Sequence, residues 1–119
     1  MKLAFVFRHS PHGSTISREG LDALLAASAF CDENKLAVFF IDDGVLNLLP
    51  HQQPEIILQK DFISGFKLLD LYDIEQRYIC SESLNDLGLI NQALVINCEK
   101  IDRTLFLQKL QKFEKIITF

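Results

Sequence analysis

The sequence contains no tryptophan, no Cys-x-x-Cys pair and no apolar run long enough to cross a membrane. A membrane-spanning helix needs about 20 predominantly apolar residues, whereas the run Leu36–Ile41 ends at Asp42 and Asp43. The N-terminal apolar run stops at Arg8 and is too short for the apolar region of a signal peptide. These absences exclude a membrane-spanning helix and favour a cytoplasmic chain.

Cysteine is also scarce, and the three that are present make an odd number. They are Cys31, Cys80 and Cys98. A disulfide framework uses cysteines in pairs, so the simpler interpretation is three reduced thiols in a reducing compartment.

Clustered positive charge is missing as well. The chain has 12 lysines and arginines against 16 acidic residues, for a formal net charge of −4. Binding to nucleic acid requires a basic face that neutralises phosphates. We therefore expect no direct nucleic-acid binding, and an acidic surface that suits protein partners.

What the chain does contain is a large apolar fraction arranged in alternating patterns. With 119 residues, 49% of them hydrophobic and ten of them phenylalanine, it suits a single domain over residues 1–119. Continuous apolar runs are typical of strands that are buried on both faces. The predicted strands are Leu3–Phe7, Leu36–Ile41, Glu75–Cys80, Ala93–Asn97 and Lys115–Phe119.

Segments with helical spacing separate these runs. Five helical segments are predicted. The first follows a Ser14 or Thr15 cap, with Leu21, Leu24, Leu25 and Ser28 inward, and the second covers Gly44–Leu49. The third begins at Pro54 and Glu55 and continues through Leu58, Phe62, Phe66 and Leu69, the fourth starts at Ser81 or Ser83 and ends at Gly88, and the fifth follows an Asp102 cap, with Leu105, Leu107 and Leu110 inward. The alternation predicts an α/β fold, a three-layer α/β/α sandwich with a five-stranded, mainly parallel sheet. The order of the strands does not follow from the pattern.

Parallel sheets bind ligands at the carboxyl ends of their strands, where three polar loops are predicted. The first, His9–Thr15, is rich in hydroxyl groups and precedes a helix, so it distantly resembles the phosphate loop of flavodoxins. Pro11 removes one N–H donor there, and His12 stands where such a loop has a hydroxyl. A helix cap and a turn are the favoured interpretation, and we expect no cofactor.

Metal binding is a second possibility for these loops. His9, His12 and Cys80 are potential ligands, but a closed zinc site needs four well-placed groups. Asp42 and Asp43 can in principle hold Mg²⁺ or transfer protons, although such a pair more often ends a strand. We expect no metal site, and we assign no role to Cys31 or Cys98.

Cys80 is the candidate with the best local setting. It is expected where a buried strand ends and a helix begins, and the N–H groups of a helix N-terminus favour a thiolate. Against this, Glu82 opposes a negative charge, and Arg77 is expected on the other face of the strand because side chains alternate. Cys80 is therefore a candidate for a reactive thiol, although its charged neighbours do not support that role.

Several sequence blocks, in order along nearly the whole chain, resemble the TusC/DsrF family. They are Pro11-His-Gly, Arg18–Ala26, Leu36–Ile41, Asp43-Gly-Val, Leu48-Leu-Pro, Phe66–Leu69, Leu71–Gln76, Cys80–Leu84 and Gly88-Leu. The most specific of them is Leu-Tyr-Asp-Ile-Glu-Gln, at Leu71–Gln76.

The resemblance implies a DsrE-like α/β sandwich and a place in a heterohexameric sulfurtransferase with TusB-like and TusD-like subunits. Such a complex relays persulfide sulfur from a TusA-like donor to a TusE-like acceptor, for 2-thiolation of the wobble uridine of tRNA. DsrF-like members serve sulfur oxidation instead. The principal cysteine of the relay belongs to the TusD-like subunit, and TusC-like subunits are mainly structural.

The resemblance therefore implies no catalytic residue in this chain, although Cys80 occupies the matching place. Two alternatives stay open. One is a sulfurtransferase subunit that carries its own persulfide on Cys80, and the other is a flavodoxin-like phosphate or flavin binder that uses Ser10–Thr15.

Overall fold

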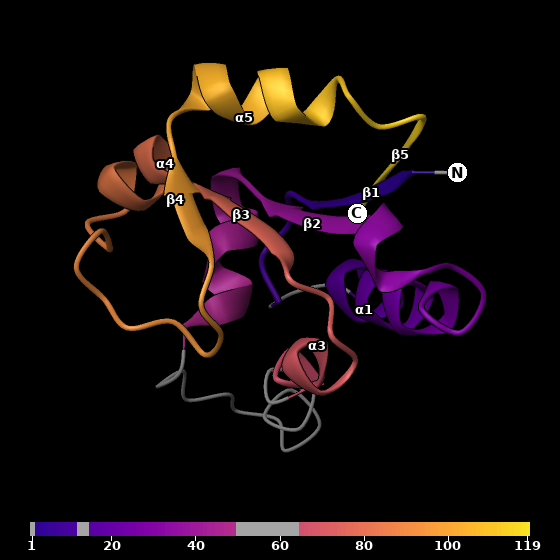
Figure 1. The fold of residues 1–119 in the computed structure, drawn as a ribbon. Coiled ribbons are helices and arrows are strands. Elements are labelled where there is room, and N and C mark those ends of the chain that lie inside the picture. The colour runs from indigo at the N-terminus through magenta and orange to yellow at the C-terminus, as the bar shows by residue number, and fades with distance from the viewer. Residues whose placement is uncertain (1, 12–14, 50–64) are drawn as a thin grey trace.

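The strands of the protein form one parallel sheet, shown in Figure 1. The computed structural model describes residues 2–11, 15–49 and 65–119. The sheet has five strands in the order β4-β3-β2-β1-β5, and all of its pairings are parallel. The strands are β1 (Leu3–Phe7), β2 (Leu36–Phe40), β3 (Gln76–Cys80), β4 (Glu99–Ile101) and β5 (Lys115–Thr118).

Helices cover both faces of this sheet, so the predicted three-layer architecture is confirmed (Figure 1). α1, η2 and α3 pack on one face and α5 on the other. The helical elements are α1 (Ile16–Ala27), η1 (Glu33–Lys35), η2 (Asp42–Leu48), α3 (Leu68–Leu71), α4 (Ser81–Asp86) and α5 (Arg103–Leu110). Of the helix predicted from Pro54, the positions up to Phe62 lie outside the described residues. Phe66 is buried in the turn before α3, and Leu69 is buried within α3.

The two faces of the sheet build two separate cores because successive side chains of a strand point to opposite sides. Phe40 joins the core beneath α1 and α3, where Phe7 stacks on it at 5.3 Å between ring centroids. Phe39 joins the core beneath α5, where Phe106 meets it edge-on at 5.1 Å. The strand β2 is buried along its whole length, as its continuous apolar sequence predicted.

The predicted fourth strand, Ala93–Asn97, is wrong, because the strand lies at Glu99–Ile101. The Val95 N–H donates to the carbonyl of Leu48 at 2.7 Å, and Ile96 is buried in the core beneath η2. The apolar residues of this segment therefore pack against the helical layer. The true strand is an edge strand that pairs only with β3, so it needs no continuous apolar run.

The inward residues predicted for the last helix are also largely wrong. Phe106 is the buried residue of α5, whereas Leu105 and Leu107 are 38% and 47% exposed. Leu110 is partly buried against the same core, because it lies one turn after Phe106. The predicted cap is confirmed, since the Asp102 carboxylate accepts a hydrogen bond from the Leu105 N–H at 2.8 Å.

The predicted end residues of α1 and α4 lie where expected, but only some of them have the expected capping role. Thr15 occupies the N-cap position of α1, but its side chain makes no capping bond and donates instead to the Glu19 carboxylate at 3.3 Å. Gly88 follows α4 with a φ of +72°, the left-handed conformation that ends many helices. Ser14 lies outside the described residues.

Candidate functional site

Four strands bring polar side chains to the carboxyl edge of the sheet, where ligands of parallel sheets bind. Arg8 follows β1 and Asp42 follows β2, while Cys80 is the last residue of β3 and Arg103 begins the helix after β4. The tertiary structure joins Arg8, Asp42 and Arg103 into one cluster at this edge, because the strands β1 to β4 lie side by side in the sheet.

Asp42 is the centre of this cluster. Its carboxylate lies 3.6 Å from the Arg8 guanidinium and 3.2 Å from that of Arg103, while its N–H donates to the Ser83 hydroxyl at 2.9 Å. Its φ of +53° is in the left-handed region, which aspartate tolerates better than most residues. Asp42, which follows β2, thereby contacts residues that follow β1, β3 and β4. The two exposed ion pairs each contribute little to stability.

Arg103 connects α5 to this edge. Its backbone N–H donates to the Glu82 carboxylate of α4, and its guanidinium binds Asp42. The hydrogen bond to Asp42 raises the pKa of Arg103, opposed by burial and aided by the negative charges nearby. The first turn of α5 is therefore held by both acidic side chains.

Cys80 lies beneath this cluster, and its predicted position is confirmed. It ends β3 and occupies the N-cap position of α4. Its side chain is completely buried in the core under α5, among Ile41, Ile101 and Phe106. Arg77 lies on the opposite side of β3 and pairs with Asp70 of α3, so it offers no charge to the thiol. A partner molecule cannot reach the sulfur unless this core opens.

The loop after β1 serves the packing of the fold. The carbonyl of His9 accepts hydrogen bonds from the Ser17 hydroxyl at 2.8 Å and from the Asn47 amide at 2.9 Å. These bonds join the loop to α1 and η2. The residues at the centre of the predicted phosphate loop, 12–14, lie outside the described residues, so this hypothesis stays a prediction.

The remaining candidates have ordinary surroundings. Within residues 2–11, 15–49 and 65–119, no group of three or more His, Cys, Asp or Glu side chains is arranged to hold a metal ion. Cys31 and Cys98 are both half-buried. Burial raises the pKa of the Cys98 thiol to about 12, with a smaller opposing effect of Arg77, so this thiol is protonated at neutral pH.

We expect the Ser83→Ala variant to lose about 1–3 kcal/mol of unfolding free energy. Ser83 is 3% exposed and its hydroxyl accepts the Asp42 N–H, so its removal leaves that donor without its partner. Urea denaturation of the two proteins measures the difference. The matched control is Ser81→Ala in the same helix, which removes no hydrogen bond found among the described residues. Equal stabilities of the two variants would contradict this role of Ser83.

Arg8 and Arg103 were not among the residues predicted for this site. Arg8 could have been recognised, because it directly follows a predicted strand on the binding edge. Arg103 could not, because the fourth strand was predicted several residues too early. Ser83 was considered only as a helix start, since a contact 41 residues away in sequence leaves no local signal.

No helix in the part of the chain that the structure describes is long and apolar enough to cross a membrane.

The fold and the cluster at its edge define an α/β protein with a buried cysteine where β3 meets α4. A model of the DsrE/DsrF-like family matches residues 1–119. The chain belongs to this family, and its resemblance to the TusC/DsrF family is confirmed.

Relatives named as TusC proteins match the chain over its whole length. It is 65% identical to a TusC homolog of Haemophilus influenzae, with 100% of both chains covered. It is 49% identical to the protein TusC of Escherichia coli O157:H7, with 99% of this chain and 98% of the relative covered. The crystal structure of the ychN protein from E. coli has the same fold, with a TM-score of 0.83 at 21% identity over 100% of this chain and 99% of that one.

Proposed function

We propose that the chain is a TusC-like subunit of a heterohexameric sulfurtransferase complex, with an assembly role in place of a catalytic one. The full-length match to relatives named TusC, at up to 65% identity, supports the family assignment. In this proposal the complex relays persulfide sulfur for 2-thiolation of tRNA wobble uridine in the cytoplasm. Its other subunits are TusB-like and TusD-like, and it exchanges sulfur with a TusA-like donor and a TusE-like acceptor.

The observation that carries the structural role is the complete burial of Cys80. In persulfide transfer, the thiolate of the acceptor attacks the outer sulfur of the donor persulfide, and the donor cysteine leaves as a thiolate. This substitution requires direct access of one sulfur to the other. Cys80 has no such access, because its side chain is completely buried in the core to which Phe106 of α5 contributes.

A second candidate function is a subunit that carries persulfide on Cys80 itself. The position of Cys80 at the carboxyl edge, where β3 ends and α4 begins, favours this alternative. It requires α5 to move away from the sheet when the donor binds. Sulfur oxidation, the role of DsrF-like members, remains an alternative pathway for the same kind of assembly.

Deletion of the chain and substitution of Cys80 distinguish these roles. We expect deletion to abolish 2-thiouridine in the tRNA substrates, whereas Cys80→Ala changes its level by less than about twofold, because no reacting group is removed. Mass spectrometry of tRNA nucleosides measures both effects, and Cys80→Ser is a second variant that differs in volume and polarity.

Each contrary result has a separate meaning. If both Cys80 variants assemble normally but lack 2-thiouridine, Cys80 is a sulfur carrier and the structural role is wrong. If deletion leaves 2-thiouridine unchanged, the chain serves another pathway, such as sulfur oxidation.

A further inference from the structure

The helix α5 exposes leucines on both of its flanks. A surface helix of a free-standing domain normally turns its large apolar residues toward the core. Here Phe106 is the one fully buried residue of the helix, while Leu105 and Leu107 are 38% and 47% exposed. Between these flanks the outward residues are Thr104, Gln108 and Gln111, which carry no charge. The exposed side of α5 therefore combines two large apolar side chains with uncharged polar ones, as expected of a surface that a partner covers.

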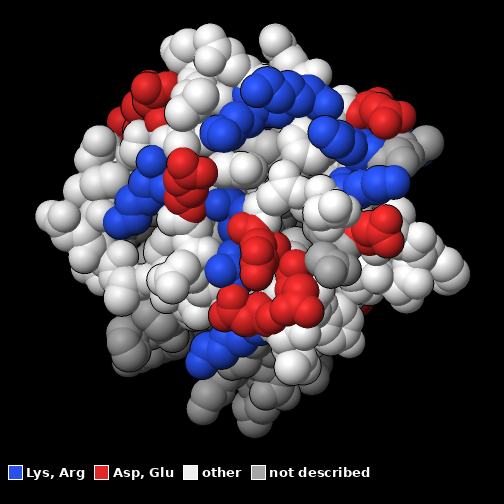
Figure 2. Space-filling view, in the orientation of Figure 1, with Lys and Arg blue, Asp and Glu red and all other residues white. Residues whose placement is uncertain are grey.

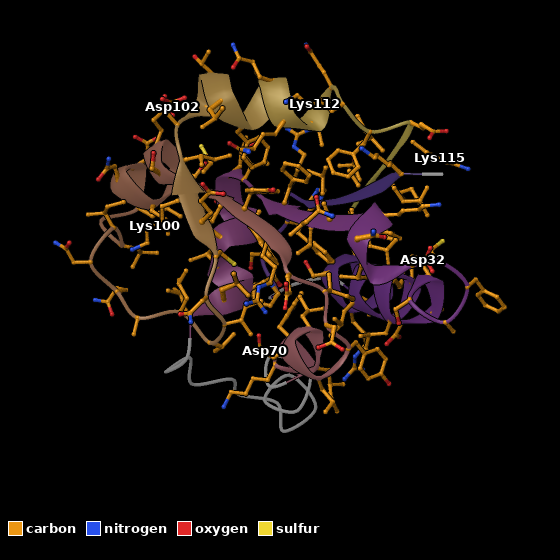
Figure 3. The ribbon with its side chains drawn as sticks, in the orientation of Figure 1. Asp32, Asp70, Lys100, Asp102, Lys112 and Lys115 are labelled. Carbon is orange, nitrogen blue, oxygen red and sulfur yellow. The ribbon has the colours of Figure 1, made fainter. Side chains whose placement is uncertain are left out.

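The charges on this helix and on the turn that follows it all have one sign. Arg103, Lys109 and Lys112 are basic, and no acidic residue occurs between Arg103 and Phe113, although the whole chain has a net charge of −4. Basic side chains follow α5 across the upper part of Figure 2, and Figure 3 places Lys112 near the end of the helix. The Lys109 ammonium lies 5.0 Å from the centroid of the Tyr78 ring, and within the described residues neither Lys109 nor Lys112 forms a salt bridge. Their charges remain available to a partner.

The uniform charge decides between two possible occupants of this surface. In a symmetric dimer built on α5, the lysines of one copy would face those of the other. Like charges that face each other across an interface are unfavourable, so a second copy packed in this way is disfavoured. An acidic surface on a different protein satisfies both the lysines and the leucines.

We propose that the exposed side of α5, with Leu105, Lys109 and Lys112 along one flank and Leu107 on the other, binds a partner subunit whose apolar patch is bordered by aspartate and glutamate. This inference rests on the proposed function, because it names the surface through which the subunit joins its complex. It also explains why α5 has leucines on its exposed side, since these leucines become buried only in the assembly.

Co-purification of the full-length chain with its co-expressed partner subunits tests this surface. The affinity tag is on a partner, and the amount of this chain retained per partner is measured. We expect Leu105→Glu/Leu107→Glu to reduce retention at least about tenfold, because it places acidic groups against an acidic surface. Lys109→Glu/Lys112→Glu removes the contact of Lys109 with the Tyr78 ring but changes no buried core residue, and it is expected to act in the same direction.

The matched control is Leu71→Glu. Leu71 is a leucine of α3 that is 73% exposed and lies on the other face of the sheet from α5. We expect this variant to be retained like the wild type. Circular dichroism of each isolated variant verifies that it is folded, and the lysine variant decides the outcome if the leucine variant does not fold.

Wild-type retention of either folded α5 variant would overturn the docking surface and leave the proposed function intact. Equal losses for the α5 variants and for Leu71→Glu would also overturn it, because the effect would not be specific to α5. Failure of the wild-type chain itself to co-purify with these partners is a different result, since it contradicts the proposed function.

Discussion

The Gly44→Ala variant is expected not to fold at 25 °C. An added Cβ at Gly44 would lie 1.8 Å from the carbonyl oxygen of Phe7 and 2.4 Å from its carbonyl carbon. Both atoms belong to the backbone of a strand that is hydrogen-bonded on both sides, between β2 and β5, so a side-chain rotation cannot relieve the clash. Either η2 must move away from β1 or the sheet must distort, and we expect a loss of more than about 4 kcal/mol.

Circular dichroism and urea denaturation measure this effect. The matched control is Gly88→Ala, since Gly88 has a φ of +72° and an added Cβ would meet no atom within 4 Å. This control has only the backbone strain of a left-handed residue, about 1–2 kcal/mol. A Gly44→Ala protein with a denaturation midpoint equal to that of the wild type would show that η2 does not pack as described.

The second large expected effect concerns the reactivity of Cys80. In the native protein we expect Cys80 to react with a thiol-specific alkylating reagent on the order of 10³-fold more slowly than Cys31. Cys80 is completely buried under α5, whereas Cys31 is partly exposed after α1. Labelling of Cys80 therefore waits for a rare opening of the structure, while labelling of Cys31 does not.

Mass spectrometry of the digested protein follows each cysteine over time. In concentrated guanidinium chloride the difference between Cys80 and Cys31 is expected to disappear, because the core no longer exists. Similar native rates for the two cysteines would contradict the closed site and would strengthen the alternative of a sulfur carrier.

Cys98 supplies an internal comparison, because its protection has a chemical cause as well as a steric one. Its pKa is raised to about 12, so the reactive thiolate is scarce at neutral pH and becomes more abundant as the pH rises toward that value. The labelling rate of Cys98 is therefore expected to rise steeply with pH over this range.

The same labelling experiment, carried out on the complex, measures whether a partner protein makes Cys80 accessible. The Asp42 carboxylate and the Arg103 guanidinium join the end of β2 to the start of α5, the helix whose Phe106 shares a core with the thiol. If a partner protein displaced this pair, α5 would lose one of its attachments to the sheet. A complex in which Cys80 becomes accessible would then reconcile a buried thiol in the isolated chain with sulfur transfer in the assembly.

The central strands were predictable because their sequence and their surroundings agree. β1 and β2 lie inside the sheet with a helical layer on each face, so nearly every position needs an apolar side chain. β4 was not predictable, because an edge strand with two exposed residues has no distinctive composition. The apolar segment Ala93–Asn97 resembled a strand more closely, yet its residues serve the packing against η2.

The candidate site was likewise predictable from the sequence only in part. The sequence alone determined that a cysteine ends the third strand beside a helix, and that Asp42 and Asp43 follow the second, because apolar runs and helix starts are local signals. It did not determine that Arg8, Asp42 and Arg103 meet, because their contact depends on the strand order.

Two properties central to the proposed function were decided by the tertiary structure alone. Burial of Cys80 depends on where α5 crosses the sheet, and the exposure of Leu105 and Leu107 depends on which side of that helix faces the core. The pattern of residues along the chain established that strands and helices alternate. Only the packing of α5, with Phe106 as its buried side chain, determined that the thiol is enclosed and the leucines face outward.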